Sequence, residues 1–177
     1  MIWFTSDTHF CHKLMLQYRP FHTIDDMNEF IIDKWNKKIG KHDIVYVLGD
    51  FGFGNREELK KILTALNGRK TLIRGNHDKR ARVHSIKGWV NVKDYHELIY
   101  KKSTRICLFH FPISDWNRRW KGSLHIHGHS HGKHNGDGRM MDVGVDALNY
   151  SPISIEDVYD RLINRPITSY VERNLEQ

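Results

Sequence analysis

The sequence predicts a layered α/β fold, and three observations support this prediction. Short apolar runs rich in Ile, Val, Leu and aromatic residues recur along the chain, as is typical of buried strands. Amphipathic helical segments alternate with some of these runs, which indicates sheets covered by helices. Polar residues directly follow several runs, at the strand ends where layered α/β proteins bind ligands. We therefore expect one layered domain spanning residues 1–177.

Six apolar runs predict strands, and most of them are followed by glycine or polar residues. Two further segments, WVNVKDY (89–95) and ELIYK (97–101), are weaker candidates. In chain order the six runs are IWFTS (2–6), DIVYVLG (43–49), KTLIRG (70–75), RICLFHF (105–111), SLHIHG (123–128) and RMMDVGVDAL (139–148).

Three segments predict amphipathic helices, because their apolar residues recur on one helical face and a capping residue precedes each. The third segment also carries Asp157 three residues after its capping serine, which approximates a capping box. The helices are expected over Asp25–Lys38 with Thr23 as the cap, from Asn55 to Asn67-Gly68, and from Ser154 to the residues before Pro166.

Composition and charge limit the classes of protein to which this chain could belong. Of the 177 residues 39% are hydrophobic and 28% charged, and no apolar run reaches the roughly 20 residues that span a bilayer. The start, MIWFTSDTHF, does not resemble a signal peptide, and only two cysteines are present, Cys11 and Cys107. We expect a cytoplasmic protein with no membrane partner. The formal net charge of +7 favours an anionic partner such as a phosphate ester or nucleic acid, although it also serves plain solubility.

Seven side chains of metal-binding type stand at or just past the ends of five predicted strands. Two carboxylates, four imidazoles and one amide oxygen are more than one ion needs, and they suit two divalent ions that share a carboxylate. Oxygen and nitrogen ligands without thiolate favour Mn²⁺, Fe or Zn²⁺. Taken singly, each residue would be read as a turn cap; together they predict a metal centre. They are Asp7, His9, Asp50, Asn76, His110, His129 and His131.

These residues lie in a series of motifs that resembles a known family. The series is Asp7-x-His9, Gly49-Asp50, Gly75-Asn76-His77-Asp78, His110 and Gly128-His129-Ser130-His131. It resembles the five motifs of the calcineurin-like metallophosphoesterase superfamily, in the family's order, from residue 1 to about residue 131. The later segment DVGVDALNYSPISIEDV resembles the small bacterial and phage-type members.

The resemblance implies a fold, a ligand set and a reaction. The fold is a four-layer αββα sandwich of two mixed β-sheets flanked by helices. One metal ion would bind Asp7, His9 and His131, the other would bind Asn76, His110 and His129, and Asp50 would bridge them. His77 would contact the phosphate and protonate the leaving oxygen, a role that suits an imidazole. Asp78 would either orient His77 or cap the next turn.

Other histidines receive a structural interpretation. Strand alternation places His125 and His127 on the face opposite to Leu124 and Ile126, so we expect them to be hydrogen-bonded core or surface residues. His127 is also a candidate to support a metal ligand because it is next to the site. His12 is expected to be structural or on the surface, with a substrate contact as the alternative.

The segment Phe111–Gly122 supplies further candidates for substrate binding, alongside Asn76 and His77. Its aromatic Trp116 could stack on a base, and Arg118 and Arg119 could bind phosphate if the loop overhangs the site. The alternative is an ordinary basic loop with packed tryptophans. Arg74 and Arg80, near the third motif, have the same two interpretations.

The functional prediction is a phosphoesterase that hydrolyses P–O bonds with a metal-bridging hydroxide. The stretch GDFGFG lacks the acidic and arginine residues typical of the family's Ser/Thr phosphatases, which makes that activity less favoured. A phosphodiesterase acting on a nucleotide or a nucleic-acid end is the first choice, on charge and on the Trp/Arg segment. The alternatives are a phosphomonoesterase, a nuclease, a non-catalytic nucleic-acid-binding module, and a silent scaffold, which the intact ligand set disfavours.

Overall fold

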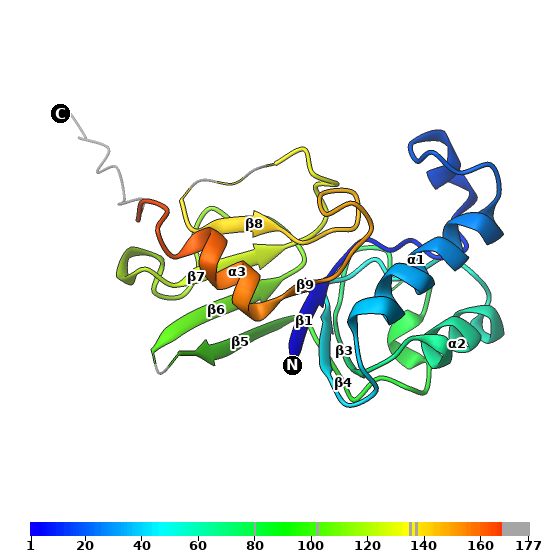
Figure 1. Cartoon of the computed structure of the whole chain (residues 1–177), viewed down its shortest axis with the longest axis horizontal. Coiled ribbons are helices and arrows are strands. Elements are labelled where there is room, and N and C mark those ends of the chain that lie inside the picture. The colour runs from blue at the N-terminus through cyan, green and yellow to red at the C-terminus, as the bar shows by residue number, and fades with distance from the viewer. Residues whose placement is uncertain (80, 102, 135, 137, 168–177) are drawn as a thin grey trace.

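The computed structural model describes residues 1–79, 81–101, 103–134, 136 and 138–167, which form two mixed β-sheets. The first sheet has the strand order β4-β3-β2-β1-β9 (Figure 1). Strands β1 to β4 pair in parallel, and β9 pairs antiparallel with β1. The strands are β1 (Ile2–Thr5), β2 (Ile44–Val47), β3 (Arg69–Ile73), β4 (Asn91–Lys93) and β9 (Ile153–Ser154).

The second sheet has the order β5-β6-β7-β8. Strand β7 pairs in parallel with both β6 and β8, while β5 runs antiparallel to β6. The strands are β5 (Tyr95–Tyr100), β6 (Thr104–Phe109), β7 (Leu124–His127) and β8 (Met140–Asp142). The two weaker strand candidates, at residues 89–95 and 97–101, thus correspond to β4 and β5. Both sheets are mixed, as predicted.

Three α-helices begin at the predicted capping residues. Helix α1 (Ile24–Lys38) is capped by Thr23, α2 (Arg56–Ala65) by Asn55 in a capping box with Glu58, and α3 (Ile155–Leu162) by Ser154. Each cap accepts a hydrogen bond from a backbone N–H of the first turn, which would otherwise lack a partner. The short 3₁₀ helices are η1 (Lys13–Gln17), η2 (Val83–Ser85) and η3 (Arg119–Lys121).

Two main cores follow from the alternation of side chains along the first sheet. Val45, Val47 and Leu72 point to one face and pack against α1 and α2. Phe4 and Ile73 point to the other face and pack against the second sheet. The described helices include none that is long and apolar enough to cross a membrane.

Helix α3 buries Val158 and Leu162 in the core that the two sheets share. The second sheet also has a face opposite to that core. A small cluster there consists of Cys107 and Met140 with the side chain of Trp116, which comes from the segment between β6 and β7. An irregular segment therefore covers this face within the described part of the chain. The layered α/β sandwich itself is confirmed.

The direction of the strands determines where the site lies. Strands β1, β2 and β3 are parallel neighbours, so the residues after them meet at one edge of the first sheet. Parallel β6 and β7 do the same in the second sheet. A bridge between Ser6 and Gly144 joins the end of β1 to the segment after β8, which brings the two edges together.

Candidate metal centre

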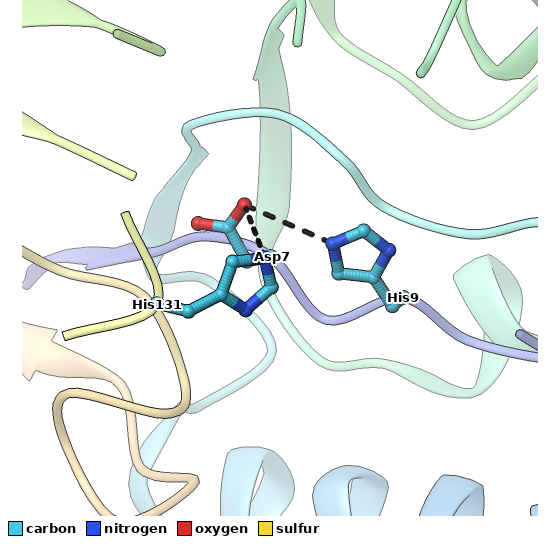
Figure 2. A group of neighbouring side chains, drawn as sticks. All are labelled: Asp7, His9 and His131. Carbon is cyan, nitrogen blue, oxygen red and sulfur yellow. Dashed lines mark ion pairs between the residues drawn. The ribbon is translucent and has the colours of Figure 1, made fainter. Parts of the chain in front are cut away.

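Three of the predicted ligands form one group around the carboxylate of Asp7. Nε2 of His9 lies 3.9 Å from Oδ1 of Asp7, and Nε2 of His131 lies 4.0 Å from the same oxygen (Figure 2). The side chain of Asp7 is fully buried, and that of His131 is partly exposed. The three ligand atoms lie within 4.8 Å of one another, which is compact enough for one ion.

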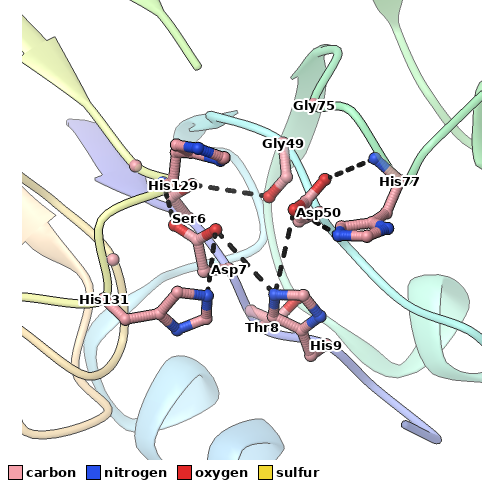
Figure 3. A network of polar contacts seen from close by, with 12 residues as sticks. Ser6, Asp7, Thr8, His9, Gly49, Asp50, Gly75, His77, His129 and His131 are labelled. Atoms are coloured by element: carbon pink, nitrogen blue, oxygen red, sulfur yellow. Dashed lines mark hydrogen bonds and ion pairs between the residues drawn. The ribbon is translucent and has the colours of Figure 1, made fainter. Parts of the chain in front are cut away.

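Asp50 lies between this group and a second one. Its Oδ2 atom is 3.6 Å from Nε2 of His110. The same oxygen is 3.9 Å from Nε2 of both His9 and His77 (Figure 3). Asp7, Asp50 and His110 also form a compact candidate group, so both carboxylates lie near the boundary between the two sites. The central position of Asp50 is the geometry that a bridging ligand requires.

Asn76 connects the remaining two histidines. Its Oδ1 atom lies 2.9 Å from Nε2 of His110 and 3.1 Å from Nδ1 of His129. The backbone N–H of His129 also donates to Oδ2 of Asp7, at 2.9 Å. The structure therefore brings all seven predicted ligands, from five different strand ends, into one continuous cluster.

The contacts of His110 are arranged as a cation would require. Its Nδ1 lies 2.7 Å from the carbonyl oxygen of Leu48, which can only accept, so Nδ1 carries the proton. Burial lowers the pKa of His110 to about 4, and the neutral ring presents a lone pair at Nε2. That lone pair faces the acceptor oxygens of Asn76 and Asp50. A divalent ion satisfies three such acceptors at once.

Two buried atoms of the other group have no hydrogen-bond partner, namely Oδ1 of Asp7 and Nε2 of His9. Burial raises the pKa of Asp7 to about 7 and lowers the pKa of His9 to about 2. Burial without a partner is costly for both atoms, and a divalent cation would remove this cost. The residues present thus fit a two-metal centre.

A buried ion pair holds His131 in place. Nδ1 of His131 donates to Oδ2 of Asp146 at 2.7 Å, which leaves Nε2 free to face Asp7. The guanidinium of Arg19 donates to both carboxylate oxygens of Asp146, each at 2.8 Å, and to the carbonyl oxygens of Asp7 and Thr8. Burial would raise the pKa of Asp146, but the hydrogen bonds from His131 and Arg19 hold it at about 2.

His12 supports His9 in a similar way. The two Nδ1 atoms lie 3.3 Å apart, and burial lowers the pKa of His12, which favours its neutral form. A neutral His12 can accept the Nδ1–H of His9, so the lone pair at Nε2 of His9 faces Asp7 and Asp50. The ring of His12 stacks on Phe53 with 3.7 Å between centroids. This residue is therefore structural, as expected, and it contacts a candidate ligand.

The backbone of the site lies in a conformation that most residues avoid. Five of the predicted ligands have left-handed φ angles between 49° and 66°. Such angles cost free energy in residues other than glycine, and they are typical of functional sites that the surrounding structure holds in place. The five are Asp7, His9, Asp50, His129 and His131.

Glycines in the motifs allow segments to approach closely. A Cβ atom on Gly128 would lie 1.9 Å from Oγ of Ser6 and 2.3 Å from Oδ2 of Asp7. A Cβ atom on Gly75 would lie 2.3 Å from Oδ1 of Asp50. Close approach to Ser6 and Asp7 therefore requires glycine at Gly128.

Asp78 caps the backbone rather than contacting the ring of His77. Its buried carboxylate accepts hydrogen bonds from the N–H groups of Asp50, Phe51 and Gly75, at 2.7–3.0 Å. It thereby ties the loop after β2 to the loop after β3. The N–H of His77 donates to Oδ1 of Asp50 at 2.9 Å, and its side chain is 42% exposed at the edge of the cluster.

The structure places the predicted aromatic and basic contacts elsewhere. Trp116 is only 6% exposed, its ring lies 5.2 Å from that of His125, and its Nε1–H donates to the carbonyl oxygen of Ser123. Arg118 lines a cavity near the start of β6, while His110 follows the end of that strand. Arg119 lies over the ring of Trp116.

The physical reason is the parallel pairing of β6 and β7, because their connection must return along the sheet before β7 begins. It carries Trp116, Arg118 and Arg119 away from the metal-binding edge. Phe111, which precedes this return, remains at the site, with its ring 4.7 Å from that of His129.

The remaining described candidates make contacts within the protein. Arg74 is paired with Asp94, and Arg80 lies outside the described residues. His125 is buried, with its ring nitrogens near the carbonyl oxygens of Cys107 and Phe111. His127 is buried beside the carbonyl oxygen of Gly128.

Sequence reasoning missed several supporting residues. Asp142 accepts hydrogen bonds from Ser130 and Gly132, and so shapes the loop that carries His129 and His131. The segment DVGVD holds both Asp142, the last residue of β8, and Asp146, and carboxylates at and just past a strand end were the available signal. Arg19 has no comparable signal, because it lies in a turn after η1, 127 positions before its partner.

Comparisons with known proteins agree with this geometry. The family model for calcineurin-like phosphoesterases matches residues 1–133. An uncharacterized protein of Methanocaldococcus jannaschii is 33% identical, with 93% of this chain and 92% of the relative covered. The gene 66 protein of Mycobacterium phage D29 is 30% identical, with 82% and 88% covered. The gene 66 protein of Mycobacterium phage L5 is 29% identical, with 92% and 93% covered.

A solved structure is also similar, that of a protein of unknown function from Aquifex aeolicus. Its TM-score is 0.72 at 28% sequence identity, and the match covers 92% of this chain and 99% of that one. The fold and the cluster of ligands define a metal-dependent phosphoesterase, a hydrolase of phosphate esters. The chain belongs to the calcineurin-like phosphoesterase family, and its phage relatives agree with a small phage and bacterial type.

Proposed function

We propose that the protein is a two-metal phosphodiesterase that acts on a nucleotide or on the end of a nucleic-acid strand. The observation that carries the two-metal part is the convergence of buried acceptor atoms around Asp50, with Oδ1 of Asp7 and Nε2 of His9 lacking any hydrogen-bond partner. One ion would be held by Asp7, His9 and His131. The other would be held by Asn76, His110 and His129, and Asp50 would contribute to both sites.

The ions and the chain divide the chemistry. When bound, two divalent ions supply positive charge to the phosphoryl oxygens and lower the pKa of the attacking water. His77 stands beside Asp50 with an exposed ring edge, so it can donate a proton to the leaving oxygen. Asn76 contributes an uncharged oxygen, which adds no repulsion toward an incoming phosphate.

The surroundings of the cluster support an ester with an organic group on the leaving side. The ring of Phe53 lies 5.0 Å from that of His77 and stacks on His12, so an aromatic wall adjoins the proposed proton donor. A cavity of about 410 Å³ opens on the other side, beside His131, and is lined by Tyr18 and Lys133 among others. An aromatic wall and a cation suit a nucleoside and its phosphate.

The proposed metal pair rests on the candidate ligands, and the proposed location rests on the cysteines. The proposed ligands are oxygens and imidazole nitrogens, which favour Mn²⁺, Fe or Zn²⁺. Cys11 and Cys107 are both free thiols, as is usual in a reducing compartment, and we propose a cytoplasmic location.

The test compares two aryl substrates on the Mn²⁺-loaded protein. We expect kcat/KM for bis(p-nitrophenyl) phosphate to exceed that for p-nitrophenyl phosphate, and the Asp50→Asn variant to lose both activities. A clear preference for the monoester would assign the protein to the phosphomonoesterases. If Asp50→Asn and the parent hydrolyse the substrates at equal rates, the activity does not depend on the proposed metal centre.

A further inference from the structure

A second cationic site lies at the opposite end of β6 from the metal centre. A cavity of about 150 Å³ is lined there by Ser103, Thr104, Arg105, Arg118, Lys121 and Arg139, among others. Four of its lining side chains carry positive charge, three more carry hydroxyl groups, and none of the described lining residues is acidic. This composition is complementary to an anion and unsuited to a cation or an apolar ligand.

Among the described residues, most of the positive charge at this cavity has no acidic partner. Arg105 pairs with Glu97. Within the described part of the chain, Arg118 and Lys121 form no ion pair, although both are exposed. Arg139 donates to the carbonyl oxygens of Gly122 and Arg165, both at 3.0 Å, and these neutral acceptors leave its charge in place. Three cations are therefore available to an anion from outside.

The backbone around the cavity is well ordered by its own hydrogen bonds. The carbonyl oxygen of Arg118 accepts from the N–H groups of Lys121 and Ser123, which closes a tight turn. Gly122 has a φ of 86°, and a Cβ atom there would lie 2.8 Å from Nη1 of Arg139. The turn thus places Arg118 and Lys121 at the same cavity as Arg139, and its backbone need not be ordered on binding.

An exposed aromatic ring adjoins these cations. Trp120 is 59% exposed, although tryptophan is usually buried, and Nζ of Lys121 lies 4.5 Å from its ring centroid. Exposed aromatic rings next to backbone-binding cations are the combination by which proteins bind single-stranded nucleic acid. A small inorganic anion would make no use of the ring.

We propose that this cavity binds a backbone phosphate of a nucleic-acid strand and that Trp120 stacks on an adjacent base. Thr104, at the cavity, and His110, at the metal centre, are separated by the length of β6. Six strand residues span about 20 Å, so the phosphate bound here is not the one that reacts. The site holds a strand of several nucleotides whose end reaches the metal centre. The position of that end at the metal centre rests on the proposed function.

The experiment measures binding of a fluorescein-labelled single-stranded oligonucleotide of about 12 nucleotides to the full-length protein, by anisotropy with chelator present. Chelation removes metal-dependent binding at the catalytic cluster. The variant is Arg118→Ala/Lys121→Ala, and the control is Lys60→Ala/Lys61→Ala, which removes the same charge from the exposed face of α2. We expect the first variant to weaken binding about tenfold and to reduce the salt slope by about 1.4, and the control to stay within about twofold.

Two outcomes would overturn the proposal. One is an equal loss of affinity in the two double variants, which would mean that only net charge matters. The other is tight binding of inorganic phosphate alone that disappears in Arg118→Ala/Lys121→Ala, which would assign the cavity to free phosphate. Turnover of the aryl diester is measured on the same variants and is expected to be unchanged. An inactive parent protein would refute the proposed function and leave the binding result intact.

Discussion

Nδ1 of His131 donates a hydrogen bond of 2.7 Å to Oδ2 of Asp146, and Asp146 is in turn held by the buried guanidinium of Arg19. This contact selects the ring nitrogen of His131 that faces Asp7. Hydrogen bonds of this kind to a metal-binding histidine orient its ring and make it a stronger ligand. The following prediction tests that relationship.

Asp146→Ala should weaken one of two Mn²⁺ binding events by about 10- to 100-fold, because His131 loses its orienting partner. Asp146→Asn should have a smaller effect, since its amide oxygen can still accept from Nδ1. Isothermal titration calorimetry on chelated protein measures both affinities, and Asp33→Asn on the surface of α1 is the control. Unchanged affinity in Asp146→Ala would show that the contact does not serve the metal.

Asp50→Asn should abolish tight binding of both ions and nearly all turnover. The reason is that Asp50, alone among the described carboxylates, has an oxygen within 3.9 Å of both His9 and His110, at the boundary of the two groups. Metal content after dialysis, measured by mass spectrometry, checks the first part. Retention of two ions per chain would remove Asp50 as the bridge.

His77→Ala should keep both ions and lower kcat by about 100-fold or more, as expected for removal of a general acid. The side chain is partly exposed and is not required to complete either ligand group. Metal content and kcat are measured together, with the exposed His42→Ala as a matched control. Loss of metal in His77→Ala would instead identify His77 as a ligand.

Asp78→Ala should lower the free energy of unfolding by about 3 kcal/mol or more, since three buried N–H groups would lose their acceptor. Asp78→Asn keeps an acceptor oxygen and should cost less. Urea denaturation of the metal-free protein gives the values. A change in Asp78→Ala below about 0.5 kcal/mol, as is common at surface positions, would contradict the capping role.

The contribution of Asp7 to the stability of the metal-free protein should be lost as the pH rises from about 4 to about 7. Burial raises the pKa of Asp7 from 3.8 to about 7, so the folded chain holds a proton in that interval that the unfolded chain has released. This contribution to stability is present at lower pH and is lost as the folded carboxyl ionises. Asp7→Asn should remove that part of the pH dependence.

Mn²⁺ favours the ionised carboxylate of Asp7, so it should raise the Tm of the parent protein more at pH 8 than at pH 6. Differential scanning fluorimetry with chelator or with Mn²⁺ measures both effects. If the parent protein and Asp7→Asn show the same dependence of Tm on pH without metal, ionisation of Asp7 does not contribute to stability.

Much of the site could be predicted from the sequence because its signal is local. Short apolar runs mark β1, β2, β3, β6 and β7, and a metal-binding residue type follows each of them. The ends of parallel strands meet at one edge, so strand direction alone was needed to bring these residues together. Capping residues likewise marked the starts of all three helices.

The sequence by itself thus determined the types of the candidate ligands, their order and the elements that carry them. Only the tertiary structure decided that Trp116 is buried, that Arg118 lies near the start of β6, and that Arg19 reaches Asp146. The physical reason is that these outcomes depend on which strands pair and in which direction, and such pairings join residues far apart in the chain. Side-chain periodicity reports only on the few residues around each position.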